Sequence, residues 1–137
     1  MTPCLINCQQ RDVVPIAWLG RVARGAVRCL KIQARGQLAI AFVDSPTMRT
    51  LNRRFMHHEG LTDVLTFRYR DEPMLGEVLV APAFARWYAK RHGLSYRQEL
   101  ARYVIHGLLH WIGHDDRTAG QRRNMRVLEE QLLKRCA

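Results

Sequence analysis

Three histidines recur every four residues in the stretch HGLLHWIGHDD, residues 106–116: His106, His110 and His114. The residues around them are mostly apolar, which predicts a helix that lies in the interior of the protein. A buried polar group without a partner costs about 1–3 kcal/mol, so an inward-facing histidine needs a hydrogen bond or a metal ion. His106 and His110 are i, i+4 neighbours on one helix face, where they can share an ion. A hydrogen-bonded core histidine is the alternative for either residue alone.

The helix must end before a third side chain can join this pair. On a continuous helix the first and third histidines would be about 12 Å apart along the axis, whereas Zn–N bonds are about 2.0–2.1 Å. Gly113 can end the helix because glycine readily adopts the left-handed conformation that turns the chain back. The possible third ligands after this turn are His114, Asp115 and Asp116. The sequence favours Asp116, with His114 as runner-up. His114 follows the glycine directly, so its side chain projects before the chain has turned back over the histidine pair, whereas two further residues let Asp116 reach that pair.

The resulting spacing, H-x-x-x-H-x-x-G-x-x-D, is similar to that of the metzincin proteases, H-E-x-x-H-x-x-G-x-x-H. Their general base is the glutamate after the first histidine. Gly107 occupies this position here. A zinc metalloprotease is therefore the less favoured hypothesis.

The charge of the chain indicates a polyanionic partner. It has 22 basic residues, of which 19 are arginine, against 12 acidic residues, a formal net charge of +10. Arginine binds phosphate through two parallel N–H groups, so RNA is the simplest partner. No RNA-binding or helix-turn-helix signature stands out, which favours contacts to phosphate and shape over base stacking, and predicts no recognition of DNA sequence.

The length and composition predict one domain over residues 1–137, because 47% of the residues are hydrophobic and no repeat is present. No apolar run approaches the roughly 18 residues of a membrane span, and the first residues lack an export signal, so we expect a cytoplasmic protein. Four cysteines without a C-x-x-C pair are then expected to be reduced. They are Cys4, Cys8, Cys29 and Cys136, and only the first two are close enough in sequence that a pairing stays open.

Hydrophobic periodicity predicts an α+β fold in which helices cover a small sheet. The expected strands span residues 5–10, 36–44, 62–69 and 76–82, and the expected helices span 14–30, 47–55, 83–92, 95–112 and 118–135. Ser45, Ser95 and Thr118 are the expected N-caps of the second, fourth and fifth helices. Pro46 fits the first helical position of the second helix.

Four segments, LNRRF, LTDVLTF, LGEV and HGLLHWIGHDD, resemble in order and separation the YbeY family of bacterial metal-dependent endoribonucleases. The resemblance covers roughly residues 36–130. It implies a mixed four-stranded sheet with about five helices, and a zinc ion held on a C-terminal helix and the turn after it. It also implies processing of ribosomal RNA, notably the 3′ end of the small-subunit rRNA, contacts with small-subunit proteins, and a part in ribosome quality control.

The resemblance assigns the first two metal ligands to His106 and His110 and the third to Asp116, where the family usually has histidine. A carboxylate binds zinc at about 2.0–2.2 Å and also suits manganese or another hard divalent metal. The family's tyrosine after the glycine is His114 here, a spare imidazole for catalysis. Its acidic neighbour is kept as Asp115, which can orient a ligand histidine.

A functional arginine of the family falls on Met56. A nearby cation stabilises the negative transition state of phosphodiester cleavage. Arg53 or Arg54 can supply this charge, as can His57 or His58, although a solvated helix face is the simpler role for at least one of the arginines.

Two further carboxylates match family positions, Asp63 and Glu77. They are expected to support the site from outside rather than to act as general bases. An rRNA-binding ribosome assembly factor, whose metal is structural and which does not cut RNA, stays open as an alternative to the endoribonuclease.

Overall fold

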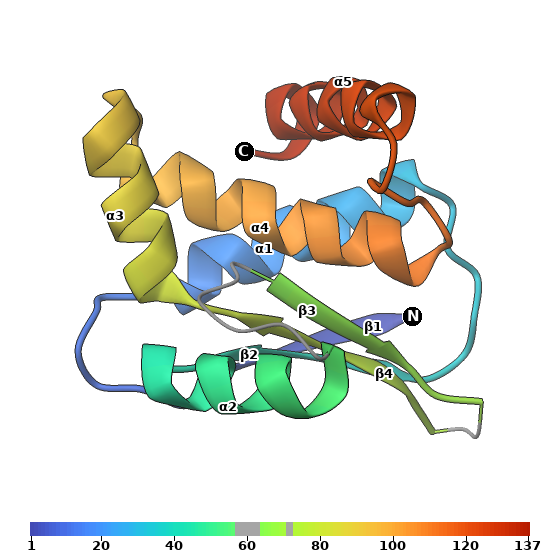
Figure 1. Ribbon diagram of the computed structural model, residues 1–137. Coiled ribbons are helices and arrows are strands. Elements are labelled where there is room, and N and C mark those ends of the chain that lie inside the picture. The colour runs from blue at the N-terminus through green and yellow to red at the C-terminus, as the bar shows by residue number, and fades with distance from the viewer. Residues whose placement is uncertain (57–63, 71–72) are drawn as a thin grey trace.

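The computed structural model describes residues 1–56, 64–70 and 73–137 (Figure 1). Its order of elements, with all four strands before the last three helices, agrees with the predicted α+β class. The elements are β1 (Thr2–Asn7), α1 (Ile16–Cys29), β2 (Gln37–Phe42), α2 (Ser45–Met56), β3 (Val64–Arg68), β4 (Met74–Val80), α3 (Pro82–His92), α4 (Tyr96–Trp111) and α5 (Ala119–Cys136).

The strands form one mixed sheet in the order β1-β2-β4-β3. β1 and β2 are parallel, as are β2 and β4, whereas β3 pairs antiparallel with β4 at one edge. This confirms the expected mixed four-stranded sheet. The register of the hairpin pairs Val64 with Val80 and Arg68 with Gly76, so β3 lies antiparallel to β4 along its whole length.

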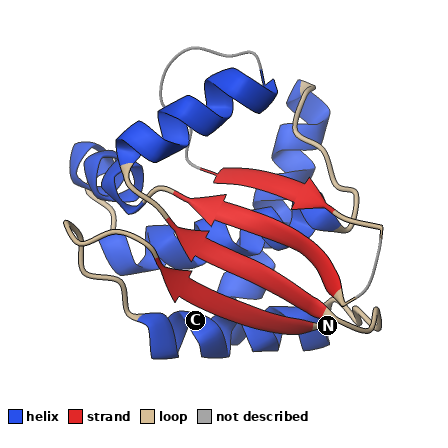
Figure 2. Ribbon diagram, turned by 90° about the horizontal axis from the view of Figure 1, so that it is seen from below, coloured by secondary structure: helices blue, strands red, loops and turns tan. Residues whose placement is uncertain are grey.

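Helices cover both faces of the sheet in separate layers (Figures 1 and 2). α2 alone lies on one face, over a small apolar cluster that includes Met48 and Leu79. α1 and α4 pack on the other face, over the larger core, and α5 lies on these two helices as an outer layer. α4 is therefore enclosed between the sheet and α5, which explains why apolar residues occupy nearly every side of it.

Two expected element starts were wrong. β1 begins and ends three residues earlier than predicted, because Gln9 belongs to a turn: its Oε1 accepts hydrogen bonds from the backbone N–H groups of Arg11 and Asp12. The cap of α2 is Asp44 rather than Ser45, since Asp44 Oδ1 accepts from the N–H of Thr47 at 2.8 Å. This hydrogen bond lowers the pKa of the Asp44 carboxyl.

The other two predicted caps are confirmed. Ser95 Oγ accepts a hydrogen bond from the Gln98 N–H at the start of α4. Thr118 and Gln121 form a complete capping box at the start of α5. Local hydrogen bonding therefore fixes where both helices of the site begin.

All four cysteines are free thiols. The fold brings together a pair that the sequence did not indicate, Cys29 and Cys136, the last residues of α1 and α5. The thiol of Cys136 is in hydrogen-bond contact with Cys29, and burial and this neighbour raise its pKa. Within the described part of the chain, no helix has the length and apolar character needed to cross a membrane.

Candidate metal centre

The helix α4 ends as the sequence predicted. Gly113 has a φ of 108°, and its N–H donates to the carbonyl of His110 at 3.0 Å. The next N–H, that of His114, donates to the carbonyl of Leu109, also at 3.0 Å. These two bonds form a Schellman motif, in which glycine lets the chain reverse over the last turn of the helix. The chain after Gly113 therefore returns toward the histidine pair.

The end of α4 is fixed to the sheet by Arg68 of β3 and by Trp111. Arg68 Nη1 donates to the carbonyl of Trp111 at 2.6 Å, and its guanidinium lies 4.1 Å from the centroid of the Trp111 ring. The indole N–H of Trp111 donates to the carbonyl of Leu75 at 2.9 Å. Arg68 thus satisfies a carbonyl that the helix itself leaves unpaired, and both contacts position the turn that follows.

Three side chains converge beside this turn: His106, His110 and Asp116. Asp116 Oδ2 lies 3.5 Å from Nε2 of His106 and 3.4 Å from Nε2 of His110. Ligand atoms around one tetrahedral zinc ion are separated by about 3.3 Å, given metal–ligand distances of about 2.0–2.1 Å. Two imidazole nitrogens and one carboxylate oxygen at these distances could hold a divalent metal ion and leave a fourth position open.

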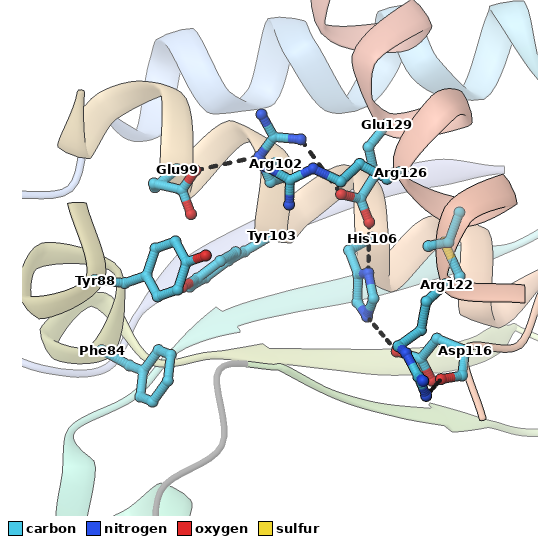
Figure 3. A pocket seen from close by; sticks show the side chains of 11 residues that line it. Phe84, Tyr88, Glu99, Arg102, Tyr103, His106, Asp116, Arg122, Arg126 and Glu129 are labelled. Atoms are coloured by element: carbon cyan, nitrogen blue, oxygen red, sulfur yellow. Dashed lines mark hydrogen bonds and ion pairs between the residues drawn. The ribbon is translucent and has the colours of Figure 1, made fainter. Parts of the chain in front are cut away.

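Glu129 of α5 orients one of these histidines. Its Oε2 lies 2.7 Å from Nδ1 of His106, and the residue is only 6% exposed (Figure 3). A carboxylate accepts hydrogen bonds, so this contact favours a proton on Nδ1 and leaves Nε2 as the nitrogen that could bind a metal ion. A carboxylate behind a ligand histidine fixes the tautomer of the ring and makes it a more basic ligand.

The sequence analysis missed Glu129. The available signal was its place on the buried face of α5, between Met125 and the pair Leu132 and Leu133. A glutamate on an apolar helix face requires a buried partner.

Arg102 offsets the negative charge behind the histidines. It contacts Glu99 at 3.2 Å, Glu129 at 3.4 Å and Glu130 at 2.5 Å. Glu99 and Glu129 are both buried, and a buried carboxylate is tolerated when it is paired. The hydrogen bond from Arg102 also lowers the pKa of the Glu130 carboxyl. One guanidinium of α4 therefore joins α4 to α5 at the level of the site.

A cavity of about 260 Å³ opens beside the metal ligands, between α3, α4 and α5 (Figure 3). His106 and Asp116 form part of its wall. The rest of the lining comprises aromatic, charged and apolar side chains: Phe84, Tyr88, Tyr103, Glu99, Glu129, Arg102, Arg122, Arg126 and Met125. A ligand in this cavity would contact both the metal site and the arginines of α5.

Comparison with known proteins identifies the family. A family model described as "Endoribonuclease YbeY" matches residues 6–137. The chain belongs to the YbeY family. A relative from Carboxydothermus hydrogenoformans named "Endoribonuclease YbeY" is 32% identical over 133 residues, which cover 94% of this chain and 93% of that protein.

A second relative of the same name, from Myxococcus xanthus, is 38% identical over 104 residues. That match covers 71% of this chain and only 35% of the Myxococcus protein, so the chain spans about a third of the length of this YbeY relative. The solution structure of TM1509 from Thermotoga maritima has the same fold, with a TM-score of 0.68, 21% identity, and coverage of 98% of this chain and 88% of that chain.

Gly107, which replaces the protease glutamate, has a packing role in this YbeY chain. A Cβ at this position would lie 2.3 Å from Cγ1 of Val78 in β4. A real Cβ does not approach another carbon so closely, and a glutamate would need far more room. The absence of a side chain lets α4 pack directly on the sheet, which leaves no place for the glutamate of a metzincin protease.

The remaining residues predicted around the YbeY metal site lie outside the group of three ligands. His114 is exposed directly after the glycine turn. Asp115 Oδ1 accepts from the N–H of Asp116 at 2.9 Å, and its Oδ2 pairs with Arg117 at 3.2 Å. Asp115 therefore supports the backbone of the third ligand, whereas the carboxylate that contacts His106 Nδ1 belongs to Glu129.

Three predicted residues, Glu77, Arg53 and Arg54, lie on the other side of the sheet. Glu77 accepts a hydrogen bond from the hydroxyl of Tyr69 at 3.0 Å, and it lies on the same face of β4 as Leu79, which packs under α2. Arg53 and Arg54 are exposed in the last turn of α2, which covers that same face (Figure 1). Met56 is the last residue of α2. His57, His58 and Asp63 lie outside the described residues.

Proposed function

We propose that this chain is a metal-dependent endoribonuclease that cuts single-stranded RNA during the maturation of ribosomal RNA, including the 3′ end of the small-subunit rRNA, and so takes part in ribosome quality control. The observation that carries this proposal is the convergence of His106, His110 and Asp116 beside a cavity lined by arginines, in a chain of an endoribonuclease family. Zinc suits these ligands best, and manganese or another divalent metal also fits a site that includes a carboxylate.

The residues of the site have separate roles in this proposal. His106, His110 and Asp116 hold the ion, which supplies Lewis acidity toward a phosphate oxygen and toward water. Glu129 keeps the His106 ring in the ligand orientation. Arg122 stands at the cavity with Nη1 donating to the carbonyl of Arg117 at 3.0 Å, so its guanidinium is already positioned for an RNA phosphate.

The sequence offers three candidates for the cation that stabilises the transition state: His114, Arg53 and Arg54. His114 directly follows the turn that carries the proposed site, whereas α2, which carries Arg53 and Arg54, covers the other face of the sheet, so we favour His114. Asp115, Asp63 and Glu77 are assigned structural roles: in this proposal they support the site without binding the ion. The family arginine position holds Met56 in this chain, and this substitution favours the second candidate function, an rRNA-binding assembly factor whose metal is structural.

The partners follow from the charge and the family. A net charge of +10 predicts binding to ribosomal RNA that weakens steeply as salt rises. Small-subunit ribosomal proteins and a cytoplasmic location belong to the same proposal. The zinc metalloprotease hypothesis has little support, because Gly107 packs against Val78 where a protease needs its general base.

One experiment separates the two RNA functions. The zinc-loaded protein is incubated with structured rRNA fragments that contain single-stranded segments, and cleavage and binding are measured on the same samples. An endoribonuclease gives a cut that a chelator abolishes and that zinc restores, and His110→Ala loses the cut while it still binds. Binding by both proteins without any cut supports the assembly factor instead. Hydrolysis of casein would favour the protease.

A further inference from the structure

The cavity beside the metal site has an aromatic side that metal binding does not use. Tyr88 and Phe84 of α3 and Tyr103 of α4 line the side away from Asp116 (Figure 3). Tyr88 is half-buried, and its ring stacks on His92 with centroids 4.1 Å apart. Phe84 is held against Tyr103 with centroids 6.5 Å apart. These ring contacts form an aromatic wall on this side of the cavity.

The opposite side of the cavity is basic. Arg122 and Arg126 of α5 line it, and both residues are exposed. Of the three carboxylates in the wall, Glu99 and Glu129 are paired with Arg102, and Asp116 belongs to the proposed metal site. The two arginines of α5 therefore give the cavity a cationic rim next to an aromatic wall.

The size of the cavity limits what it can take. Its volume of about 260 Å³ lies just below the roughly 300–1,000 Å³ of typical small-molecule pockets, so it suits a single ring system. A flat ring against aromatic side chains, with a phosphate on arginine, is how proteins hold an unpaired nucleotide of RNA. The hydroxyl of Tyr88 has no hydrogen bond to any residue that the structure describes, and it can pair with the edge of a base.

We propose that this cavity binds one unpaired nucleobase of the RNA, stacked against Tyr88 and Phe84, with the adjoining phosphates on Arg122 and Arg126. Because His106 and Asp116 form part of the same wall, this nucleotide sits at a fixed distance from the metal site. The inference rests on the proposed function and deepens it, since it explains how a site that reads phosphates would select single-stranded RNA. It adds base stacking to the phosphate contacts expected from the charge.

The test is an abasic scan of a short single-stranded RNA. A set of fluorescent oligonucleotides, each lacking the base at one position, is titrated with the zinc-loaded full chain, and affinity is read from anisotropy. We expect one position at which loss of the base weakens binding roughly 5- to 150-fold, the range for one stacked base. In Tyr88→Ala, removing the base at that position should not weaken binding further, because the stacking contact between the base and Tyr88 is already lost.

Two control variants distinguish the loss of base stacking from a general loss of folding. Val127→Ala shortens an apolar side chain of α5 that is 55% exposed and does not line the cavity, and it should bind every RNA as the wild type does. Tyr88→Phe keeps the stacking surface and should retain most of the affinity. If Tyr88→Ala fails to fold, judged by thermal unfolding and zinc content, the scan with wild type and Tyr88→Phe still decides.

The outcomes separate this inference from the proposed function. A uniform scan with no sensitive position overturns the base site, as does a Tyr88→Ala chain that folds and shows the same sensitive position as wild type. Either result can occur in a chain that cuts RNA. A position whose sensitivity to base loss is absent in Tyr88→Ala supports the base site. If the same protein cuts no RNA, the base site stands and the endoribonuclease hypothesis is wrong.

Discussion

Glu129 Oε2 lies 2.7 Å from Nδ1 of His106, so a carboxylate on α5 sets the orientation of a ligand on α4. The two residues are 23 positions apart in sequence, and only the packing of the two helices brings them together. The same glutamate is paired with Arg102 at 3.4 Å. The candidate metal site is therefore built from α4, the turn after it, and the buried face of α5.

Glu129→Gln should weaken zinc binding about 10- to 100-fold, the usual effect of removing a carboxylate behind a ligand histidine. Glutamine keeps the size of the side chain but lacks the charge that makes the imidazole a more basic ligand. Affinity is measured by competition with a chromophoric chelator. Glu130→Gln is the matched control, because Glu130 also contacts Arg102, whereas the contact with Nδ1 of His106 belongs to Glu129. An equal loss in both variants would show that general charge, not orientation of His106, sets the affinity.

Asp116→Ala should lose the metal, whereas His114→Ala should keep it. Asp116 Oδ2 is within 3.5 Å of both histidine nitrogens, while His114 is exposed beyond the turn. Asp116→His should retain the metal, because an imidazole is also a zinc ligand. Elemental analysis after zinc supplementation measures all three. A full site in Asp116→Ala together with an empty site in His114→Ala would reverse the assignment.

Gly107→Ala should destabilise the protein by about 1–3 kcal/mol, the usual cost of overpacking a core. The added Cβ would lie 2.3 Å from Val78 Cγ1, which outweighs the roughly 1 kcal/mol that alanine gains over glycine in a helix. Urea unfolding measures the change. The same substitution in a Val78→Ala background should cost less, since the clashing methyl is gone. Equal costs in the two backgrounds would mean that α4 does not pack on β4 as described.

Cys136 should react slowly with iodoacetamide at neutral pH and faster at alkaline pH. Burial, with Cys29 beside it, raises the pKa of its thiol, and only the thiolate is nucleophilic, so less of the reactive form exists at a given pH. Mass spectrometry of the labelled native protein follows each cysteine. Cys8, which is exposed, is the internal reference. Cys29→Ser should move the labelling of Cys136 to lower pH; labelling of Cys136 as fast as that of Cys8 at neutral pH would contradict the burial.

The features that depend on the spacing of nearby residues were predicted best from the sequence. The break at Gly113 and the convergence of His106, His110 and Asp116 follow from helix geometry and the freedom of glycine, which act within eleven residues. The turn at Gln9 was missed because it depends on hydrogen bonds from the backbone N–H groups of Arg11 and Asp12 to the Gln9 side chain, whereas the hydrophobic pattern alone predicts a strand there. Asp44 was missed as a cap because Ser45 competes for that role one residue later.

The contacts between distant elements could not be predicted from periodicity. The pairing of His106 with Glu129 and of Cys29 with Cys136 depends on how α5 lies on α4 and α1, and a hydrophobic stripe gives the face of a helix but not its partner. The resemblance supplied the sheet and the ligand positions. It did not indicate Glu129, although the buried face of α5 carried that signal.

The docking of α5 also sets an order of events during synthesis. Chains are made from the N-terminus, and His106 and His110 are made before Glu129, at about 5–20 residues per second. A nascent chain that ends within α4 therefore has both imidazoles but not the carboxylate that fixes the tautomer of one of them. At the proposed site, full metal affinity would therefore require that the final helix has been made and has packed. Tight retention of an ion would then report that the whole domain has matured, and a chain truncated before Glu129 should release the ion readily.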